Sequence, residues 1–232
     1  MDISIVIPAY NEEKRLGQTL RHVANYLESK SYQKEVLVIN DGSKDKTGSL
    51  VQEFCNKYSF IKLIDNPINS GKAYSVNRGM LLASGRRILF MDADGSTPIE
   101  ELEKLNKAIE HGFDIAIGSR RVSGANVVED QSIPRLFLGW IFRHIVSFIL
   151  PLKIIDTQNG FKLFKNEIAK NVFSKQKTFG WAFDVEILLI ATRLGYKIKE
   201  VPIVWHNDRE SKVKLLGKIK MLFEILKIRF FV

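Results

Sequence analysis

Short apolar runs recur through the first half of the chain, separated by polar turns and by stretches with helical spacing of apolar residues. The runs that predict strands are Ile3–Ile7, Val36–Ile39, Ile61–Ile64, Ile88–Met91 and Ile115–Ile117. The amphipathic stretches that predict helices between them are Lys14–Ser29, Thr47–Tyr58, Ala73–Ala83 and Ile99–His111. The apolar residues within each run are mostly consecutive, which indicates strands covered on both faces. The pattern therefore predicts an α/β fold with a mostly parallel central sheet flanked by helices.

The second half of the chain is less regular. The stretch Gly118–Arg135 is long, polar and glycine-containing, which is typical of a mobile or substrate-ordered loop. We expect helices over Leu136–Leu150 and Asp184–Leu194, and further strands over Gly160–Phe164 and Ile198–Val204. No change in composition marks a second independent domain.

The C-terminal stretch Lys212–Phe231 is predicted to form a basic amphipathic helix. At about 100° per residue, one stripe is apolar: Leu215, Ile219, Leu222, Phe223, Leu226 and Phe230. The basic residues lie off this stripe: Lys214, Lys218, Lys220, Lys227 and Arg229. Such a helix either lies in a membrane interface or packs on the domain with a solvated basic back.

Charge and cysteine content narrow the classes of partner and compartment. The 232 residues include 35 Lys and Arg against 26 Asp and Glu, a net charge of +9, which predicts an anionic partner. Cys55 is the single cysteine, so the chain forms no intramolecular disulfide, and a reducing compartment is favoured. The N-terminus has no signal-peptide pattern, and no run reaches about 18 apolar residues. We therefore expect a chain that does not cross a bilayer.

Polar residues follow three of the predicted strands. Pro8–Glu12 follows the first, Asp41–Ser43 the second, and Asp92-Ala93-Asp94 the fourth. The carboxyl ends of parallel strands share one edge of a sheet, where ligands of such folds gather. Two carboxylates as close as Asp92 and Asp94 repel each other unless a cation lies between them. The sequence thus predicts a divalent cation that carries a phosphorylated substrate.

Other interpretations of these motifs are weaker. Asp92 and Asp94 could cap the helix that follows Thr97-Pro98. A phosphatase of the haloacid dehalogenase type would carry its Asp-x-Asp on the first strand, with a later lysine and acidic pair. A P-loop ending at Lys72 would need glycine at position 66 and Ser or Thr at position 73, where the chain has Asn66 and Ala73. A glycine turn into a helix with Lys72 at its start remains, and it suits a phosphate.

These motifs together resemble the inverting family-2 nucleotide-sugar glycosyltransferases of the GT-A fold. The resemblance rests on Ile5–Glu12, Val38–Ser43 and Met91–Asp94, in the same order and spacing. Three further segments look like the dolichyl-phosphate glucosyltransferase branch, among the polyprenyl-phosphate hexosyltransferases: Gly118–Arg120, Asp156–Phe164 and Trp181–Glu186. The resemblance implies a domain over 1–210, with a nucleotide-sugar-binding half (1–118) and an acceptor half (119–210), followed by the basic helix over 211–232.

The resemblance also implies roles for individual residues. The nucleotide would contact Pro8, Ala9, Tyr10, Asn11, Glu12, Asp41 and Gly42, with Asp41 at the edge of the base and Lys72 close by. Asp92-Ala93-Asp94 would carry Mg²⁺ or Mn²⁺ on the diphosphate, with Asp92 and Asp94 as ligands. Relatives place cations around the donor and acceptor phosphates at the positions of Arg120, Arg135, Arg209 and Lys212.

The acceptor decides which further residues are catalytic. A lipid phosphate has a second pKa of about 6 and is largely deprotonated at neutral pH, so it needs little help from a base. A sugar hydroxyl would need a carboxylate base, and Asp156 and Asp184 are the candidates for that role or for orienting the acceptor. Asp94 and Arg120 complete the predicted catalytic set. Alternatively, Asp156 binds backbone amides in a loop, and Asp184 is a helix N-cap.

The leading hypothesis is an enzyme that transfers glucose from UDP-glucose to a polyprenyl phosphate, as a peripheral protein at the cytoplasmic face of a membrane. The alternatives are transfer to a saccharide hydroxyl, transfer of mannose from GDP-mannose, and a non-enzymatic module that binds anionic membranes. No aromatic and basic ribbon suggests a nucleic-acid partner. A separate membrane subunit or a homo-oligomer is compatible with the sequence.

Overall fold

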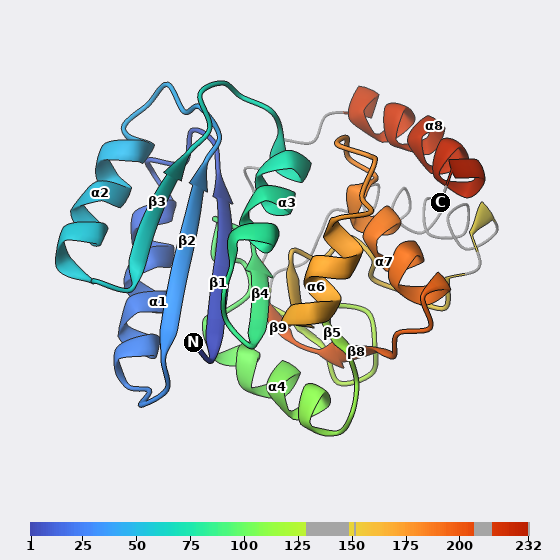
Figure 1. Cartoon of the computed structure of the whole chain (residues 1–232), viewed down its shortest axis with the longest axis horizontal. Coiled ribbons are helices and arrows are strands. Elements are labelled where there is room, and N and C mark those ends of the chain that lie inside the picture. Colours follow the sequence, from blue (N-terminus) through green and yellow to red (C-terminus); the bar gives the residue numbers. More distant parts are fainter. Residues whose placement is uncertain (129–148, 151, 207–214, 232) are drawn as a thin grey trace.

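The computed structural model of the chain describes residues 1–128, 149–150, 152–206 and 215–231, and its centre is a seven-stranded sheet (Figure 1). The strand order is β3-β2-β1-β4-β7-β5-β8. The strands are β1 (Ile3–Ala9), β2 (Lys34–Asn40), β3 (Ile61–Asp65), β4 (Arg87–Met91), β5 (Ile115–Ser119), β7 (Phe161–Lys165) and β8 (Ile198–Pro202). Only β7 is antiparallel to its neighbours in this sheet, β4 and β5. The predicted fold class, α/β with a mostly parallel sheet, is confirmed.

Helices cover both faces of the sheet. They are α1 (Leu16–Glu28), α2 (Thr47–Lys57), α3 (Lys72–Leu82), the 3₁₀ helix η1 (Ile99–Glu101), α4 (Leu102–Glu110), α6 (Asn166–Phe173), α7 (Phe183–Arg193) and α8 (Leu215–Phe231). Side chains of α3, α6, α7 and α8 form the core on one face, and those of α1, α2 and α4 the core on the other. Along β1, Val6 enters the first core, whereas Ile5 and Ile7 enter the second. Consecutive apolar residues are required because both faces are buried.

The second half departs from the predicted elements in two places, and one predicted element falls outside the described residues. Helix α6 was not predicted. A short parallel pair joins β6 (Asn126–Val127), inside the predicted loop, with β9 (Val204–Trp205), which begins at the last residue of the predicted strand Ile198–Val204. The predicted helix Leu136–Leu150 and the end of the predicted loop, residues 129–135, lie almost wholly outside the described residues. Through β9 the chain returns to the carboxyl edge of the sheet, where the His206 amide donates to the Ser96 carbonyl at 2.8 Å.

Helix α8 has two apolar faces. Met221, Ile225 and Ile228 are buried in the core beside α7. From the predicted apolar stripe, Phe223, Leu226 and Phe230 are instead exposed. The side chains of the other stripe residues and of two predicted basic positions lie outside the described part: Leu215, Ile219, Leu222, Lys214 and Lys218. Packing on the domain is thus confirmed, but through a face that the predicted stripe did not include.

None of the helices in the described part of the chain has both the length and the apolar character needed to span a bilayer.

Candidate active site

The three polar motifs meet at the carboxyl edge of the parallel strands, the upper edge of the sheet in Figure 1. Pro8 and Ala9 are the last residues of β1, and Ala9 pairs with Asn40 of β2. The Asp41 amide donates to the Ala9 carbonyl at 2.8 Å, which joins the first two motifs directly. Asp92 begins the loop after β4, the strand on the other side of β1. Their shared edge agrees with the expectation from the sequence.

The loop that follows β1 is fastened to the loop that follows β2. The Asn11 amide donates to Ser43 Oγ at 3.0 Å, and Asn11 Oδ1 accepts the Lys44 amide at 2.8 Å. The Glu12 amide donates to Thr47 Oγ1 at 2.8 Å, while its carboxylate pairs with Arg15 at 2.7 Å. These contacts fix the backbone of the predicted nucleotide loop, with Tyr10 half-buried beside it.

Asp41 organises the turn that leads into α3. One buried carboxylate oxygen accepts from Asn66 Nδ2 at 2.8 Å and from the Ser70 amide at 3.0 Å, and the other accepts from the Gly71 amide at 2.7 Å. Gly71 has a φ of 91°, a conformation that glycine adopts without strain. The turn places Lys72 at the start of α3. The contact of Asp41 with a base stays a prediction; its part in presenting Lys72 was not foreseen.

Gly42 allows the two loops to approach closely. Its φ is 65°, and a Cβ built on it would lie 2.7 Å from the carbonyl carbon of Ile68. Any side chain at Gly42 would therefore push apart the Asp41 loop and the turn before Lys72.

Lys72 and Asp92 form an ion pair at the centre of this edge. Lys72 Nζ lies 2.7 Å from Asp92 Oδ1 and 5.4 Å from the centre of the Phe90 ring. The other side of the carboxylate faces Gly160, where an added Cβ would lie only 2.0 Å from Asp92 Oδ2. The Asp92 amide also donates to the Gly160 carbonyl at 3.0 Å. The absence of a side chain at Gly160 thus leaves room for the Asp92 carboxylate.

Asp94 lies beside this pair, and among the described residues it has no basic partner of comparable proximity. Its Oδ1 accepts the Ser96 amide at 2.9 Å. Burial, and then the negative charge of Asp92, raise the pKa of Asp94 above its ordinary value. Of these two carboxylates, only that of Asp92 has a direct ion pair within the described residues, and the repulsion between the two favours a further cation.

The donor set fits Mg²⁺ or Mn²⁺ held jointly with a diphosphate. Among the described residues, no group of three or more His, Cys, Asp and Glu could hold a metal ion by itself. Mg²⁺ commonly binds through one or two carboxylates together with substrate phosphates and water. Asp92 and Asp94 supply such a partial shell, and Lys72 already marks the place of a positive charge against Asp92.

Arg120 and Asp156, from the predicted acceptor half, form a bidentate ion pair. Arg120 Nε and Nη2 donate to the two carboxylate oxygens at 2.8 and 2.7 Å, and the Arg120 amide adds a contact of 2.9 Å. The guanidinium also lies 5.0 Å from the centre of the Trp205 ring. Burial alone would raise the pKa of Asp156, but the hydrogen bonds and charge of Arg120 outweigh it and hold the pKa below its ordinary value. Asp156 is therefore a poor candidate for a base.

Asp184 is paired with Lys162, a fully buried lysine and the second residue of β7. Lys162 Nζ also donates to the Asn159 carbonyl at 2.6 Å. The N-cap of α7 is Ala182, and no side chain caps it, so the alternative that Asp184 is an N-cap is wrong. Like Asp156, which pairs with Arg120, Asp184 neutralises a cation of the domain.

The comparisons with known proteins decide the family. Residues 4–173 match glycosyl transferase family 2. The chain belongs to this glycosyltransferase family. It is 40% identical over 99% of its length to a dolichyl-phosphate beta-glucosyltransferase of Trichomonas vaginalis, of which it covers 73%. It is 36% identical over 98% of its length to the human dolichyl-phosphate beta-glucosyltransferase, of which it covers 74%.

Solved structures agree on the fold. Glucosyl-3-phosphoglycerate synthase from Mycobacterium tuberculosis, in complex with Mn²⁺, UDP-glucose and phosphoglyceric acid, superposes with a TM-score of 0.72. The match covers 100% of this glycosyltransferase and 80% of that chain, at 17% identity. The predicted GT-A fold and the resemblance to family 2 are thus confirmed.

Three candidate site residues of this glycosyltransferase lie outside the described structure, and one buried lysine beside the candidate site was not predicted. Arg135, Arg209 and Lys212 lie outside the described residues. Lys162 was not predicted, although a lysine inside the apolar segment Phe161–Phe164 is a recognisable signal, because a buried ammonium needs a partner. The identity of its partner, Asp184, could not be predicted from the sequence, because the two residues are 22 positions apart and meet only in the folded chain.

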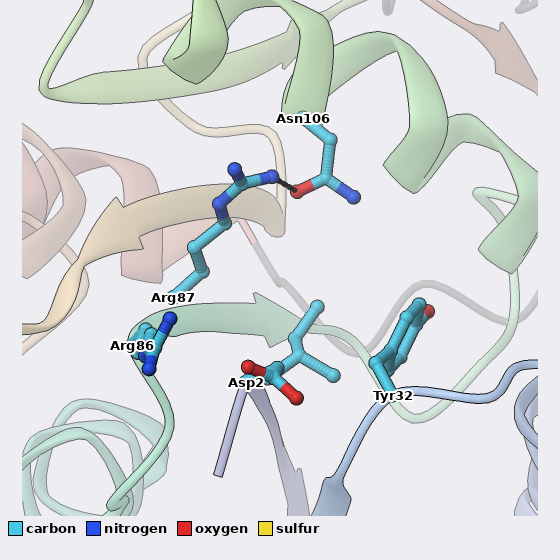
Figure 2. A pocket seen from close by; sticks show the side chains of 6 residues that line it. Asp2, Tyr32, Arg86, Arg87 and Asn106 are labelled. Atoms are coloured by element: carbon cyan, nitrogen blue, oxygen red, sulfur yellow. Dashed lines mark hydrogen bonds between the residues drawn. The ribbon is translucent and has the colours of Figure 1, made fainter.

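A cavity of about 240 Å³ lies at the opposite edge of the glycosyltransferase sheet (Figure 2). It is lined by Asp2, Ile3, Tyr32, Arg86, Arg87 and Asn106. Arg87 Nη1 donates to Asn106 Oδ1 at 2.8 Å within it. No predicted site residue lines this cavity, and it lies at the start of β1 and β4 rather than at their ends.

Proposed function

We propose that this glycosyltransferase transfers glucose, with inversion, from UDP-glucose to the phosphate of a polyprenyl lipid of the dolichyl type. The observation that carries the proposal is the Asp92 and Asp94 pair with Lys72 at the carboxyl edge, in a chain similar along nearly its whole length to dolichyl-phosphate beta-glucosyltransferases. UDP-glucose as the donor is supported by the structural neighbour whose complex contains Mn²⁺ and UDP-glucose.

The donor diphosphate would lie against Asp92, Asp94 and Lys72. Asp92 and Asp94 would hold Mg²⁺ or Mn²⁺, which neutralises the diphosphate and so stabilises the nucleoside diphosphate as it leaves. Lys72 stands at the first turn of α3, where the helix dipole also favours an anion. Its ammonium is positioned to exchange its contact with Asp92 for one with a phosphate oxygen.

The state of the acceptor-side carboxylates favours a phosphate acceptor over a hydroxyl acceptor. Asp156 and Asp184, the two predicted bases, each bind a cation: Asp156 binds the half-buried Arg120, and Asp184 binds the fully buried Lys162. Neither is available to remove a proton without breaking its ion pair. A phosphate monoester is already ionised at neutral pH and can attack the anomeric carbon without such help. In this proposal Arg120, fixed by Asp156 and Trp205, orients the anionic acceptor.

A lipid acceptor places the enzyme at a membrane. We propose peripheral attachment at the cytoplasmic face, with residues 1–118 binding the donor, 119–210 the acceptor, and the C-terminal helix contacting the bilayer.

Transfer of labelled glucose to lipid tests the proposal directly. Purified protein is incubated with Mn²⁺, polyprenyl phosphate, and either labelled UDP-glucose or labelled GDP-mannose. We expect a product that is extracted into organic solvent, is labile to mild acid, and forms only with UDP-glucose. An acid-stable product on an added saccharide would favour the hydroxyl acceptor. The absence of any lipid product, in an assay where the human relative is active, would refute the proposal.

A further inference from the structure

Helix α8 leaves one of its two apolar faces uncovered. Phe223, Leu226 and Phe230 are 64%, 44% and 78% exposed. Their spacing places them on one side of the helix, opposite the buried Met221, Ile225 and Ile228. The packing of α8 on the domain therefore does not explain why its outer face is apolar. A contiguous exposed face of this kind marks a site of interaction.

A second group of exposed aromatic side chains lies beside the donor site. Tyr74, Phe179 and Trp181 are 41%, 47% and 40% exposed. The rings of Tyr74 and Phe179 are in contact, with 6.0 Å between their centres. Tyr74 lies in the first turn of α3, close to Lys72 in sequence. These aromatic side chains therefore stand at the carboxyl edge of the sheet.

Glu224 joins the two groups. Its side chain extends from α8, and its Oε2 accepts the Ala182 amide at 3.0 Å. The same carboxylate fills the space at Gly180, where an added Cβ would lie 2.1 Å from Glu224 Oε1. The loop with Phe179 and Trp181 thus lies directly beside α8, as Figure 1 shows in orange and red.

The same loop is anchored from the interior. The fully buried Glu186 accepts the amides of Lys177 and Thr178 at 2.9 and 2.7 Å. With Glu186 on one side and Glu224 on the other, the loop is held in one conformation. The loop therefore loses little further conformational entropy when its exposed aromatic side chains bind a surface.

The charges around the apolar face of α8 are positive. Among the α8 side chains that the structure describes, the exposed charged ones are Lys220, Lys227 and Arg229. Lys220 and Lys227 lie on one flank of the apolar face, and Arg229 lies on the other. An apolar face with aromatic residues and basic flanks is suited to the headgroup region of an anionic bilayer.

We propose that these side chains form one membrane-seating surface: Tyr74, Phe179, Trp181, Phe223, Leu226 and Phe230. It inserts into the interface of an anionic bilayer and holds the carboxyl edge of the sheet over the lipid. The inference rests on the proposed function, because a lipid acceptor has to reach the site from the bilayer. A second copy of the chain is a less suitable occupant, since two α8 helices face to face would bring like charges together.

Vesicle binding by matched variants tests this surface. The test variant is Phe223→Ser/Leu226→Ser/Phe230→Ser, and the control variant is Leu82→Ser/Leu194→Ser. Leu82 and Leu194 are 53% and 41% exposed at the ends of α3 and α7, at the opposite edge of the sheet. With vesicles that contain phosphatidylserine, we expect the partition coefficient to fall at least about tenfold in the test variant and less than about twofold in the control.

A labelled variant covers the case in which the triple variant fails to fold. In a Cys55→Ser background, Phe230→Cys and Leu194→Cys are labelled with an environment-sensitive fluorophore. Addition of anionic vesicles should shift the emission of the Phe230→Cys label to the blue and leave the Leu194→Cys label unchanged. Unchanged vesicle binding by the triple variant, or equal shifts at both labels, would overturn the proposal. So would a change in oligomeric mass, by light scattering, without a change in vesicle binding.

Transfer assays separate this inference from the proposed function. Both stand if the triple variant glucosylates a short, water-soluble prenyl phosphate as the wild type does but loses transfer to polyprenyl phosphate in vesicles. If the wild type binds vesicles through this surface but glucosylates neither acceptor, the proposed function fails and the membrane-seating surface stands.

Discussion

The two proposed halves of this glycosyltransferase, residues 1–118 for the donor and 119–210 for the acceptor, bring acidic residues to the same edge of the sheet in opposite electrostatic states. In the proposed nucleotide-sugar-binding half, Asp92 pairs with Lys72, and the pKa of Asp94 is raised by burial and by the negative charge of Asp92. In the acceptor half, Asp156 and Asp184 each have a cation of their own. Here the pKa of Asp156 is lowered, because Arg120 outweighs burial.

This difference indicates two roles. Asp92 and Asp94 are suited to bind a cationic ligand, whereas Asp156 and Asp184 stabilise the fold through their ion pairs. An under-compensated pair attracts a further positive charge, whereas a bidentate ion pair satisfies its own charge and fixes the chain around it. On this view the donor half supplies the electrostatics of the reaction, and the acidic residues of the acceptor half hold Arg120 and α7 in place. The following predictions test that division.

Removal of either donor-half carboxylate should have the largest effect on activity. We expect Asp92→Asn and Asp94→Asn each to reduce glucosyl transfer about 100- to 1000-fold, the range found when a stabilising contact to developing charge is removed. The matched control is Asp65→Asn, which alters an exposed carboxylate at the end of β3 on the same edge. Activity of either test variant within a few-fold of the control would mean that the pair is not part of the site.

Removal of an acceptor-half carboxylate should act first on stability. Asp156→Asn leaves the half-buried Arg120 without its anion, and we expect a loss of about 1–3 kcal/mol in the free energy of unfolding. Denaturant unfolding measures it, with Asp94→Asn for comparison. The division would fail if Asp94→Asn destabilised the protein as strongly as Asp156→Asn.

Replacement of Lys72 should reduce activity less than removal of Asp92 or Asp94, and it should change Mn²⁺ affinity and glucosyl transfer in opposite directions. Lys72→Met removes the ammonium that lies against Asp92, so Mn²⁺ alone should bind more tightly in the absence of donor. Transfer should nevertheless fall about tenfold, because a charge-assisted contact to the diphosphate is lost. Calorimetry measures the Mn²⁺ affinity, and steady-state kinetics measure the rate of glucosyl transfer. Weaker Mn²⁺ binding by Lys72→Met would contradict the proposal that the Lys72 ammonium occupies the place of the metal ion against Asp92.

The smallest effect concerns the pH dependence of stability, and its sign should differ between the two halves. The pKa of Asp156 is lowered on folding, so its stabilising contribution is present above the unfolded pKa of about 3.9 and disappears as pH falls through the folded pKa. The pKa of Asp94 is raised, so its ionised form destabilises the fold at neutral pH. Without metal, Asp94→Asn should therefore be more stable than the wild type at pH 7, and Asp156→Asn less stable. Thermal unfolding in a chelator measures both; equal signs would contradict the comparison.

The sequence predicts the donor half better than the acceptor half, for a physical reason. Parallel strands buried on both faces leave consecutive apolar runs, and their carboxyl ends must share an edge, so β1, β2 and β4 with their motifs follow from pattern alone. Asp156 with Arg120, and Asp184 with Lys162, are joined only by the tertiary fold. The antiparallel insertion of β7 between β4 and β5 brings them together, and no local pattern specifies it.

The C-terminal helix shows the same limit. The helical spacing of its apolar residues predicts a helix, and the structure shows Phe223 and Phe230 on one exposed face of it. A helix with apolar residues on opposite sides does not reveal which side packs on the domain. Met221 and Ile225 take the inner position because they fit against α7, which only the tertiary structure discloses.

The most direct test of the central claim is the binding of Mn²⁺ to the free protein and to the protein with UDP-glucose, measured by electron paramagnetic resonance. We predict that UDP-glucose strengthens Mn²⁺ binding in the wild type and in Asp65→Asn, and that this coupling is lost in Asp92→Asn and Asp94→Asn. Coupling of wild-type strength in both of these variants would show that the cation and the diphosphate are held elsewhere.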